Sequence, residues 1–307
     1  KEDICATCSV DINSALTVAT GVESGPMQLL GRLTSNGEVK ILDVNGFLFG
    51  KNSVVDTQGF AAIGGALKNA GSFLADGKMD IDVAEDASIV IEQGAMISVA
   101  DAGLAAFVAP HISNSGIINA KMGTVALTAG ETITLDLYGD GLVEVAVEGE
   151  LADALIENSG KITAEGGRVQ MTALAAKGAV DNIINTSGII TVASAEVVGG
   201  KIVLSGGNKG VVSVSGIADA SGTDGGSIEV TGENVHVTDT ATLSVDGGRG
   251  VDQQGDGGSA LIYGDKLAVL EGRISGRGGA VGGDGGKAEL SAGGSVGFNG
   301  LDRKSTR

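Results

Sequence analysis

Apolar and polar residues alternate along most of this chain, in short runs separated by glycine-rich turns. Residues 160–164 (GKITA), for example, lead through Gly166 and Gly167 into residues 168–172 (RVQMT). The same order of run, turn and run begins again at residues 116, 188, 216, 241 and 272. A period of two places successive side chains on opposite faces of a strand, so each run predicts a β-strand with one buried face.

The runs recur at a long and nearly constant interval. Gly160, Gly188 and Gly216 begin three successive repeats 28 residues apart, and later repeats begin near residues 242 and 272. A strand–turn–strand repeat of this length is typical of a solenoid, in which each coil buries its inward side chains on its neighbours. A β-sandwich would show strands spaced by about 8–12 residues and no long period.

These patterns predict an all-β fold, a right-handed parallel β-helix of roughly a dozen coils, whose hand follows the rule for parallel crossovers. Glycine, Asn and Asp fit its corners, which need a positive φ or a small residue. The positions predicted for its core are Ile162, Val169, Ile190, Ile202, Ile228 and Val230.

Two segments interrupt the repeat. Residues 132–137 (TITLDL) and 142–147 (LVEVAV) flank the loop 138–141 (YGDG), which predicts an antiparallel hairpin outside the helix. Residues 173–185 (ALAAKGAVDNIIN) are rich in alanine and fit either a short helical turn or a wide corner.

Composition supports this fold class. Glycine makes up 53 of 307 residues and proline only 2, which excludes collagen. The chain has 32 Val and 23 Ile against 23 Leu, a balance that favours strands. The net charge of −18 disfavours nucleic acid and anionic lipid as partners. No apolar run approaches the roughly 18 residues of a membrane span, so we expect no membrane insertion.

Candidate chemistry is sparse. Cys5 and Cys8 form one CxxC, and a zinc site would need two further ligands, so we expect a small local disulfide or two free thiols. His111 and His236 are the only histidines, and both are expected at solvated turns or strand edges. The chain starts at Lys1 and shows no signal peptide, which we interpret as a fragment or a mature product.

A more specific signal lies near the start. Residues 31–39 (GRLTSNGEV) and 45–51 (NGFLFGK) resemble the secretion domain of filamentous haemagglutinin-like adhesins, the exoproteins of bacterial two-partner secretion. Members typically read G-x-L-x-A-N-G-x-V-x-x-x-N-P-N-G-I-x-F-G. Residues 123–142 resemble the end of that domain, and residues 166–185 and 277–291 resemble family repeats. The turn that the family writes Asn-Pro-Asn-Gly is here Asp43, Val44, Asn45 and Gly46.

The resemblance implies a domain organisation. Residues 1–14 would be a divergent N-terminal segment, and residues 15–130 a secretion domain that is incomplete at its start. Residues 131–300 would be β-helix repeats, and residues 301–307 a tail.

The resemblance also implies a function. It implies export through an outer-membrane pore partner of a Gram-negative bacterium. It further implies that the protein is secreted or held at the cell surface, and that it adheres to host cells, glycans or matrix. It gives no catalytic residues.

Three alternatives remain open. A polysaccharide-degrading β-helix enzyme would need clustered carboxylates, and its sugar cleft would use aromatic residues, yet the chain has no Trp and two Tyr. A calcium site is suggested by residues 247–254 (GGRGVDQQ), which nearly match one calcium-binding nonapeptide, with Asp252 and Asp256 as candidate ligands. A purely structural extracellular filament would share the fold and differ from an adhesin only in its partner.

Overall fold

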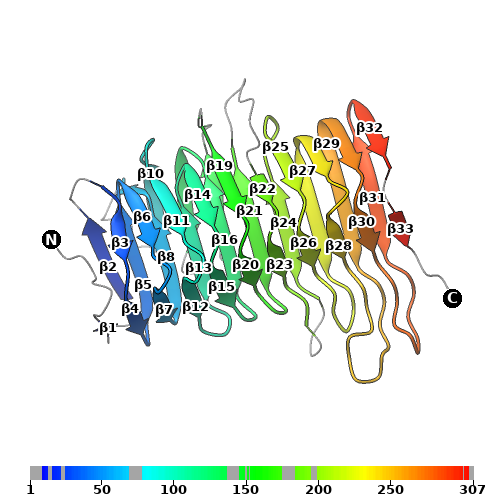
Figure 1. Ribbon diagram of the computed structural model, residues 1–307, viewed down its shortest axis with the longest axis horizontal. Coiled ribbons are helices and arrows are strands. Elements are labelled where there is room, and N and C mark those ends of the chain that lie inside the picture. Colours follow the sequence, from blue (N-terminus) through cyan, green and yellow to red (C-terminus); the bar gives the residue numbers. More distant parts are fainter. Residues whose placement is uncertain are drawn as a thin grey trace.

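The computed structural model describes residues 9–12, 16–21, 25–68, 78–136, 145–148, 151, 153–174, 184–194, 199–299 and 301–303. These residues form strands, turns and bends and no helix. The strands stack side by side along one long axis, so that the first and last strands lie at opposite ends of the molecule (Figure 1). The predicted parallel β-helix is confirmed.

Each regular coil has three faces. The strands of the first face pair in parallel from coil to coil: β2(Leu16–Gly21), β5(Glu38–Asp43), β8(Gly59–Ile63), β13(Leu104–Val108), β16(Thr124–Ala129), β21(Arg168–Ala173), β24(Lys201–Ser205), the first parts of β27(Ser227–Val237) and β29(Ser259–Leu270), and β31(Lys287–Ala292).

The second face joins the first along a corner and belongs to the same sheet. Its strands are β3(Met27–Leu29), β6(Gly46–Phe49), β11(Ser88–Ile91), β14(His111–Asn114), β19(Leu155–Asn158), β22(Ile184–Thr186), β25(Val211–Val214), the second parts of β27 and β29, and β32(Ser295–Phe298).

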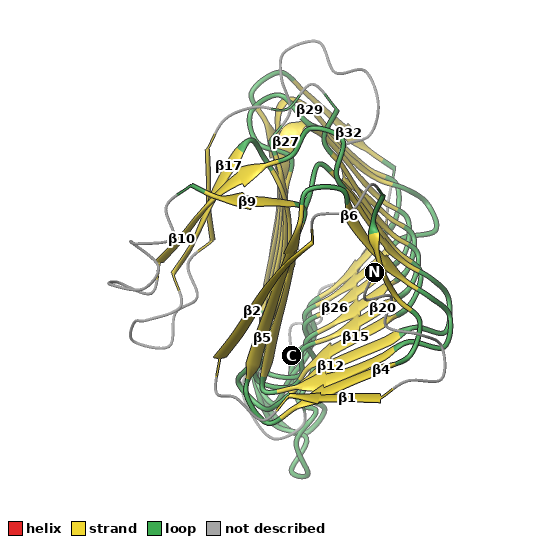
Figure 2. Cartoon of the chain, turned by 90° about the vertical axis from the view of Figure 1, so that its left-hand side faces the viewer, coloured by secondary structure: helices red, strands yellow, loops and turns green. Residues whose placement is uncertain are grey.

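The third face is a separate parallel sheet of eleven described strands, which Figure 2 shows from the N-terminal end of the molecule. They are β1(Ser9–Ile12), β4(Arg32–Ser35), β7(Val54–Thr57), β12(Met96–Val99), β15(Ile117–Ala120), β20(Lys161–Thr163), β23(Ile189–Thr191), β26(Ile217–Asp219), β28(Thr242–Ser244), β30(Arg273–Ser275) and β33(Leu301–Arg303).

The register along the third face reports the length of each coil. Lys161 pairs with Ile189, and Ile189 with Ile217, which confirms the 28-residue repeat. Two steps are much longer, since Val54 pairs with Met96 after 42 residues and Ile117 with Lys161 after 44. The chain leaves the helix in these two steps and returns to it.

One continuous core runs through the coils. All six positions predicted for it have side chains at most 1% exposed: Ile162, Val169, Ile190, Ile202, Ile228 and Val230. Successive side chains of a strand alternate between its faces, so that Ile162, for example, points inward between Lys161 and Thr163, which are more exposed.

The two long steps build a small antiparallel sheet outside the helix, with the strand order β18(Val145–Glu148), β17(Thr132–Asp136), β10(Lys78–Val83) and β9(Gly65–Leu67). The predicted hairpin is confirmed as β17 and β18, whereas its loop lies outside the described residues. The sequence did not predict that β17 would pair with β10, from a different insertion. Figure 2 shows this extra-helical sheet beside the wall that contains β2 and β5.

The expectations for residues 173–185 and for membrane insertion can be compared only with the residues that the structure describes. Of residues 173–185, those from 175 to 183 lie outside the description, so the choice between a helical turn and a wide corner stays open. The described part of the chain contains no helix that is long and apolar enough to cross a membrane.

Candidate functional site

The motif turn lies at the corner between the first and second faces. Asp43 ends β5 and Gly46 begins β6. The backbone N–H of Asn45 donates to Asp43 Oδ1 at 2.8 Å, and the side-chain Nδ2 of Asn45 donates to the same oxygen at 3.1 Å. Asp43 is only 3% exposed, whereas Val44 is exposed at the tip. The aspartate therefore holds the turn through its own carboxylate, as Asp commonly does.

Gly46 is required at this corner for two reasons. Its φ is +88°, in the left-handed region that disfavours residues with a Cβ. It also pairs with Ser88 of the next coil, and a Cβ on Gly46 would overlap the backbone carbonyl oxygen of Ser88. The turn thus sets both the direction of the chain and the close stacking of two coils.

Four phenylalanine side chains pack together in the core on the inward side of the turn. The rings of Phe47 and Phe49 have centroids 6.2 Å apart, and Phe49 lies 5.9 Å from Phe60 and 6.2 Å from Phe107. All four side chains are buried. This cluster was not among the predicted core positions, although the F-L-F spacing of residues 47–49 places both rings on the inward face.

The extra-helical sheet covers the outer surface next to the turn. Leu42, the residue before Asp43, is buried in a second core together with Met79 and Ile81 of β10. The other members of this core are Ala61, Ile63, Val83, Ala106 and Val108, which come from β8, β10 and β13. The motif turn is therefore supported from inside by the main core and from outside by this sheet.

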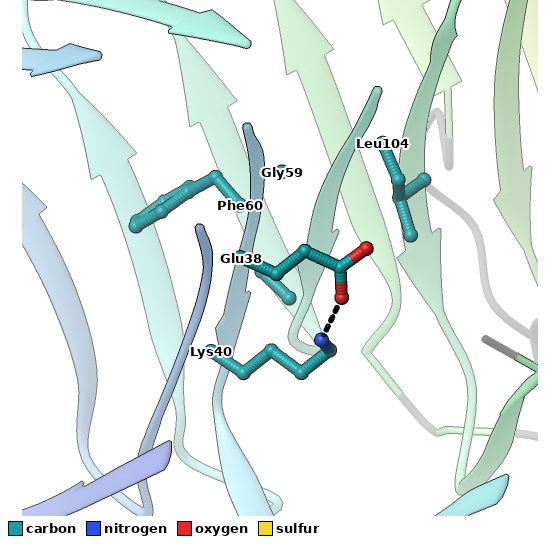
Figure 3. Close-up of a pocket in the computed structure, with 6 residues that line it drawn as sticks. Glu38, Lys40, Gly59, Phe60 and Leu104 are labelled. Atoms are coloured by element: carbon teal, nitrogen blue, oxygen red, sulfur yellow. Dashed lines mark hydrogen bonds and ion pairs between the residues drawn. The ribbon is translucent and has the colours of Figure 1, made fainter. Parts of the chain in front are cut away.

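An ion pair between a buried lysine and an exposed glutamate lies on the same outer wall. Lys40 Nζ contacts Glu38 Oε2 at 2.6 Å, and Lys40 is 3% exposed (Figure 3). The two residues line a hollow of about 20 Å³ together with Gly59, Phe60, Ala61 and Leu104. That volume suits about one water molecule. Strand alternation does not predict this pair, because an outward lysine on a strand is expected to be solvated.

The carboxylates considered for calcium have partners in the backbone. Asp252 Oδ1 accepts the N–H of Gln254 at 3.3 Å, and Asp256 Oδ1 accepts the N–H of Asp284 at 2.7 Å. Asp224 Oδ1 accepts the N–H of Asp256 in the same way, at 3.0 Å. Among the described residues, no group of three or more His, Cys, Asp or Glu side chains could hold a metal ion. Within this range, Asp224 and Asp256 link successive glycine-rich corners through hydrogen bonds.

Asp246 and Arg277 form an ion pair at these corners, with Arg277 Nη2 2.8 Å from Asp246 Oδ2. Burial of the Asp246 carboxyl acts to raise its pKa, but hydrogen bonds from Arg277 and Ser275 outweigh burial and lower the pKa below 3.8. The hydrogen bond to Asp246 in turn raises the pKa of Arg277. The pair lines a polar hollow of about 350 Å³ that is otherwise bordered mainly by glycine.

The histidines are not brought into a catalytic arrangement within the described structure. His236 Nε2 lies 2.8 Å from Glu271 Oε2. His111 is exposed at the start of β14 and pairs in register with Ser88 and Leu155. Cys5 and Cys8 lie outside the described residues.

The fold and the motif corner define an elongated β-helical protein with an extra-helical sheet beside its N-terminal coils. Residues 11–230 match the family model of the TPS secretion domain, and the chain belongs to this family. A crystal structure of the HMW1 secretion domain from Haemophilus influenzae is similar, with a TM-score of 0.69 and 22% sequence identity. The match covers 96% of this chain and 91% of that chain. No curated protein matches the sequence.

The family defines the route that the protein takes. A TPS secretion domain marks an exoprotein of two-partner secretion, which leaves a Gram-negative bacterium through an outer-membrane TpsB partner. The predicted export route and the predicted class of outer-membrane partner therefore stand.

Proposed function

We propose that this chain belongs to a surface-associated adhesin that binds host cells, glycans or extracellular matrix. The observation that carries the proposal is the combination of a TPS secretion domain with a long β-helix. Such a helix presents extended walls on which many weak contacts can add up. An adhesive surface of this kind would use an outer wall or the extra-helical hairpin.

The test is binding of the purified, folded chain to cultured cells, to immobilised matrix proteins and to a glycan array. Saturable binding that is lost on unfolding supports adhesion. The same chain binding nothing above an unrelated β-helical protein of similar charge would contradict it and favour a purely structural filament.

We further propose that the turn from Asp43 to Gly46 acts in export. The turn is supported by the phenylalanine cluster inside and by the extra-helical sheet outside. Loss of its shape would therefore disturb the coils that contain the motif. Export is measured as the fraction of chain outside cells that also produce its TpsB partner. We expect Gly46→Val to accumulate inside the cell, and export equal to the parent would overturn this role.

The proposal gives the chain no catalytic activity. The ion pair of Asp246 and Arg277 is explained by contacts between corners, and the small hollow beside Lys40 has no room for a sugar. Hydrolysis or elimination of any polysaccharide, abolished by changing one Asp or Glu, would favour the enzyme alternative.

A calcium role for Asp252 and Asp256 predicts that added calcium raises the melting temperature of the chain. An unchanged melting temperature would contradict a calcium site.

The division at residue 130 is kept as a proposal. The family model runs from residue 11 to residue 230, and β16 and β21 pair in register across the proposed boundary. Strands β1 and β33 also lie within the segments 1–14 and 301–307. Export of chains that end at residue 130 or at residue 230 tests the division, which requires the shorter chain to be exported.

A further inference from the structure

One inward row of the second face changes from apolar to polar and back. Register places Ile91 beside Asn114, Asn114 beside Asn158, Asn158 beside Thr186, and Thr186 beside Val214. The three polar members are 0%, 1% and 2% exposed in the order Asn114, Asn158, Thr186. A buried amide is costly in such a place unless its hydrogen bonds are made.

The three polar side chains satisfy one another along the row. Asn114 Nδ2 donates to Asn158 Oδ1 at 2.8 Å, and Asn158 Nδ2 donates to Thr186 Oγ1 at 3.3 Å. The first asparagine is held by its own corner, because the N–H of Gly116 donates to Asn114 Oδ1 at 3.1 Å. The result is a directional ladder that crosses three coils, here called the amide ladder (Asn114, Asn158, Thr186).

The backbone repeats the same contacts at each of these corners. The N–H groups of Ser159 and Gly160 donate to the carbonyl of Asn114, at 2.8 and 3.0 Å. Those of Ser187 and Gly188 donate to the carbonyl of Asn158, both at 2.9 Å. The amide ladder thus lies at successive corners that repeat the same backbone hydrogen bonds.

The position of the amide ladder coincides with an interruption of the helix. Between Asn114 and Asn158 the chain leaves to form β17 and β18, and the coil step is 44 residues instead of the following 28. A long insertion lets the returning strand slip along its neighbour with little strain, and an apolar row tolerates a slip of two residues because the same face stays inward. The amide ladder removes that tolerance, because a two-residue slip sets Asn114 opposite Ile156 and leaves its Nδ2 unpaired.

At the first insertion the same row is apolar, with Phe49 beside Ile91. There the ring of Phe49 packs against Phe60 and Phe107, and these contacts hold it in place. The second insertion has no described aromatic contact of this kind.

We propose that the amide ladder is a register lock, which selects the correct pairing of β19 on β14 when the chain returns from the extra-helical hairpin. The native register keeps both side-chain hydrogen bonds of the amide ladder, whereas a slipped register buries amide groups that have no partner. A buried unpaired group costs about 1–3 kcal/mol, which corresponds to a preference of about 5-fold to 150-fold for the native register.

The experiment reads register with disulfides in a background of Cys5→Ser and Cys8→Ser. Ser113→Cys with Glu157→Cys reports the native register, since these outward positions are paired. Ser113→Cys with Leu155→Cys reports a two-residue slip and is too long to bridge in the native fold. Each chain is unfolded in urea and refolded in a redox buffer, and the bridged fraction is measured by mass spectrometry.

We expect Asn114→Leu combined with Asn158→Leu to raise the slipped bridge at least about tenfold over the parent. Asn158→Thr keeps an acceptor for Asn114 and should retain the native bridge. Ile156→Val changes packing in the same strand without touching the amide ladder, and is the matched control, with the native bridge unchanged. A double Leu variant whose slipped bridge stays as rare as in the parent would overturn the proposal.

A second measurement applies if the double variant does not refold. Asn158→Leu alone leaves the Nδ2 of Asn114 unpaired, so its melting temperature should fall further than that of Ile156→Val. Equal melting temperatures for these two single variants would also overturn the proposal.

Discussion

At the scale of single residues, polar side chains and glycine shape the corners of the coils. Asp43 accepts two hydrogen bonds from Asn45, and Asp256 accepts one from the backbone of the next coil. Each carboxylate satisfies N–H groups that a tight corner leaves without a strand partner. Asp252 and Asp256, the candidate calcium ligands, both accept hydrogen bonds from backbone N–H groups at such corners.

Gly46→Val tests the corner at the motif turn. We expect the free energy of unfolding to fall by about 1 kcal/mol or more, because the φ of +88° is unfavourable for valine and the Cβ would overlap Ser88. Urea unfolding measures the change. Gly282→Ala is the control, since a Cβ there meets only Gln254 Cγ at 3.8 Å and the φ is not positive. Equal losses in the two variants would argue against a special role for Gly46.

Asp246→Asn tests the ion pair with Arg277. The folded state lowers the pKa of Asp246 below 3.8, so the charged form stabilises the fold above that pH. This contribution disappears as the pH falls through the lowered pKa. We expect the parent to be more stable than the variant at pH 5 and the difference to shrink toward pH 2, as measured by urea midpoints. A difference that is constant with pH would show that the charge of Asp246 contributes nothing.

At the scale of elements, the extra-helical sheet is the feature that two insertions build together. Strand β10 pairs with β17, which lies about fifty residues further along the chain, and its inward side chains close a second core over β8 and β13. This sheet ties the coils before the first insertion to those before the second. Its stability therefore depends on burial of a few side chains against the outer wall.

Ile81→Ala tests that contact. Ile81 is fully buried in the second core, so we expect the variant to lose about 2–5 kcal/mol of local stability. Amide hydrogen exchange should speed up in β9 and β10 and stay slow in β24 and β27. Ile217→Ala, at a side chain 44% exposed on the third face, should change little. Uniformly faster exchange along the whole helix would contradict an independent extra-helical sheet.

At the scale of the whole molecule, stacked coils and a net charge of −18 act against each other. Folding gathers the negative charges onto one rod, so self-repulsion opposes the compact state. Salt weakens this repulsion, as the Debye length falls from about 30 Å at 0.01 M to about 8 Å at 0.15 M.

We therefore expect the melting temperature at pH 7 to rise as sodium chloride increases over this range. Near pH 4.4, the isoelectric point, the effect should vanish because little net charge remains to be screened. Thermal unfolding followed by circular dichroism at the two pH values makes the comparison. A melting temperature that falls with salt at pH 7 would show that attractive ion pairs, not net repulsion, dominate.

The sequence by itself determined the coil. Alternation decides which side chains point inward, as Ile162 and Val169 show, and the glycines at 160, 188 and 216 mark the corners at a constant spacing. Both signals are local, because the period of a strand and the φ of a corner depend on neighbouring residues only. The motif of residues 31–51 likewise indicated the family without any knowledge of contacts.

Only the tertiary structure decided which distant segments meet. Nothing in the pattern of residues 78–83 names β17 as the partner of β10, and nothing in the composition predicts that Asn114 would donate to Asn158 inside the core. Lys40 likewise follows an outward pattern and is nevertheless buried beside Glu38. Such pairings depend on where the coils bring the chain in space, and alternation carries no information about the partner across an insertion.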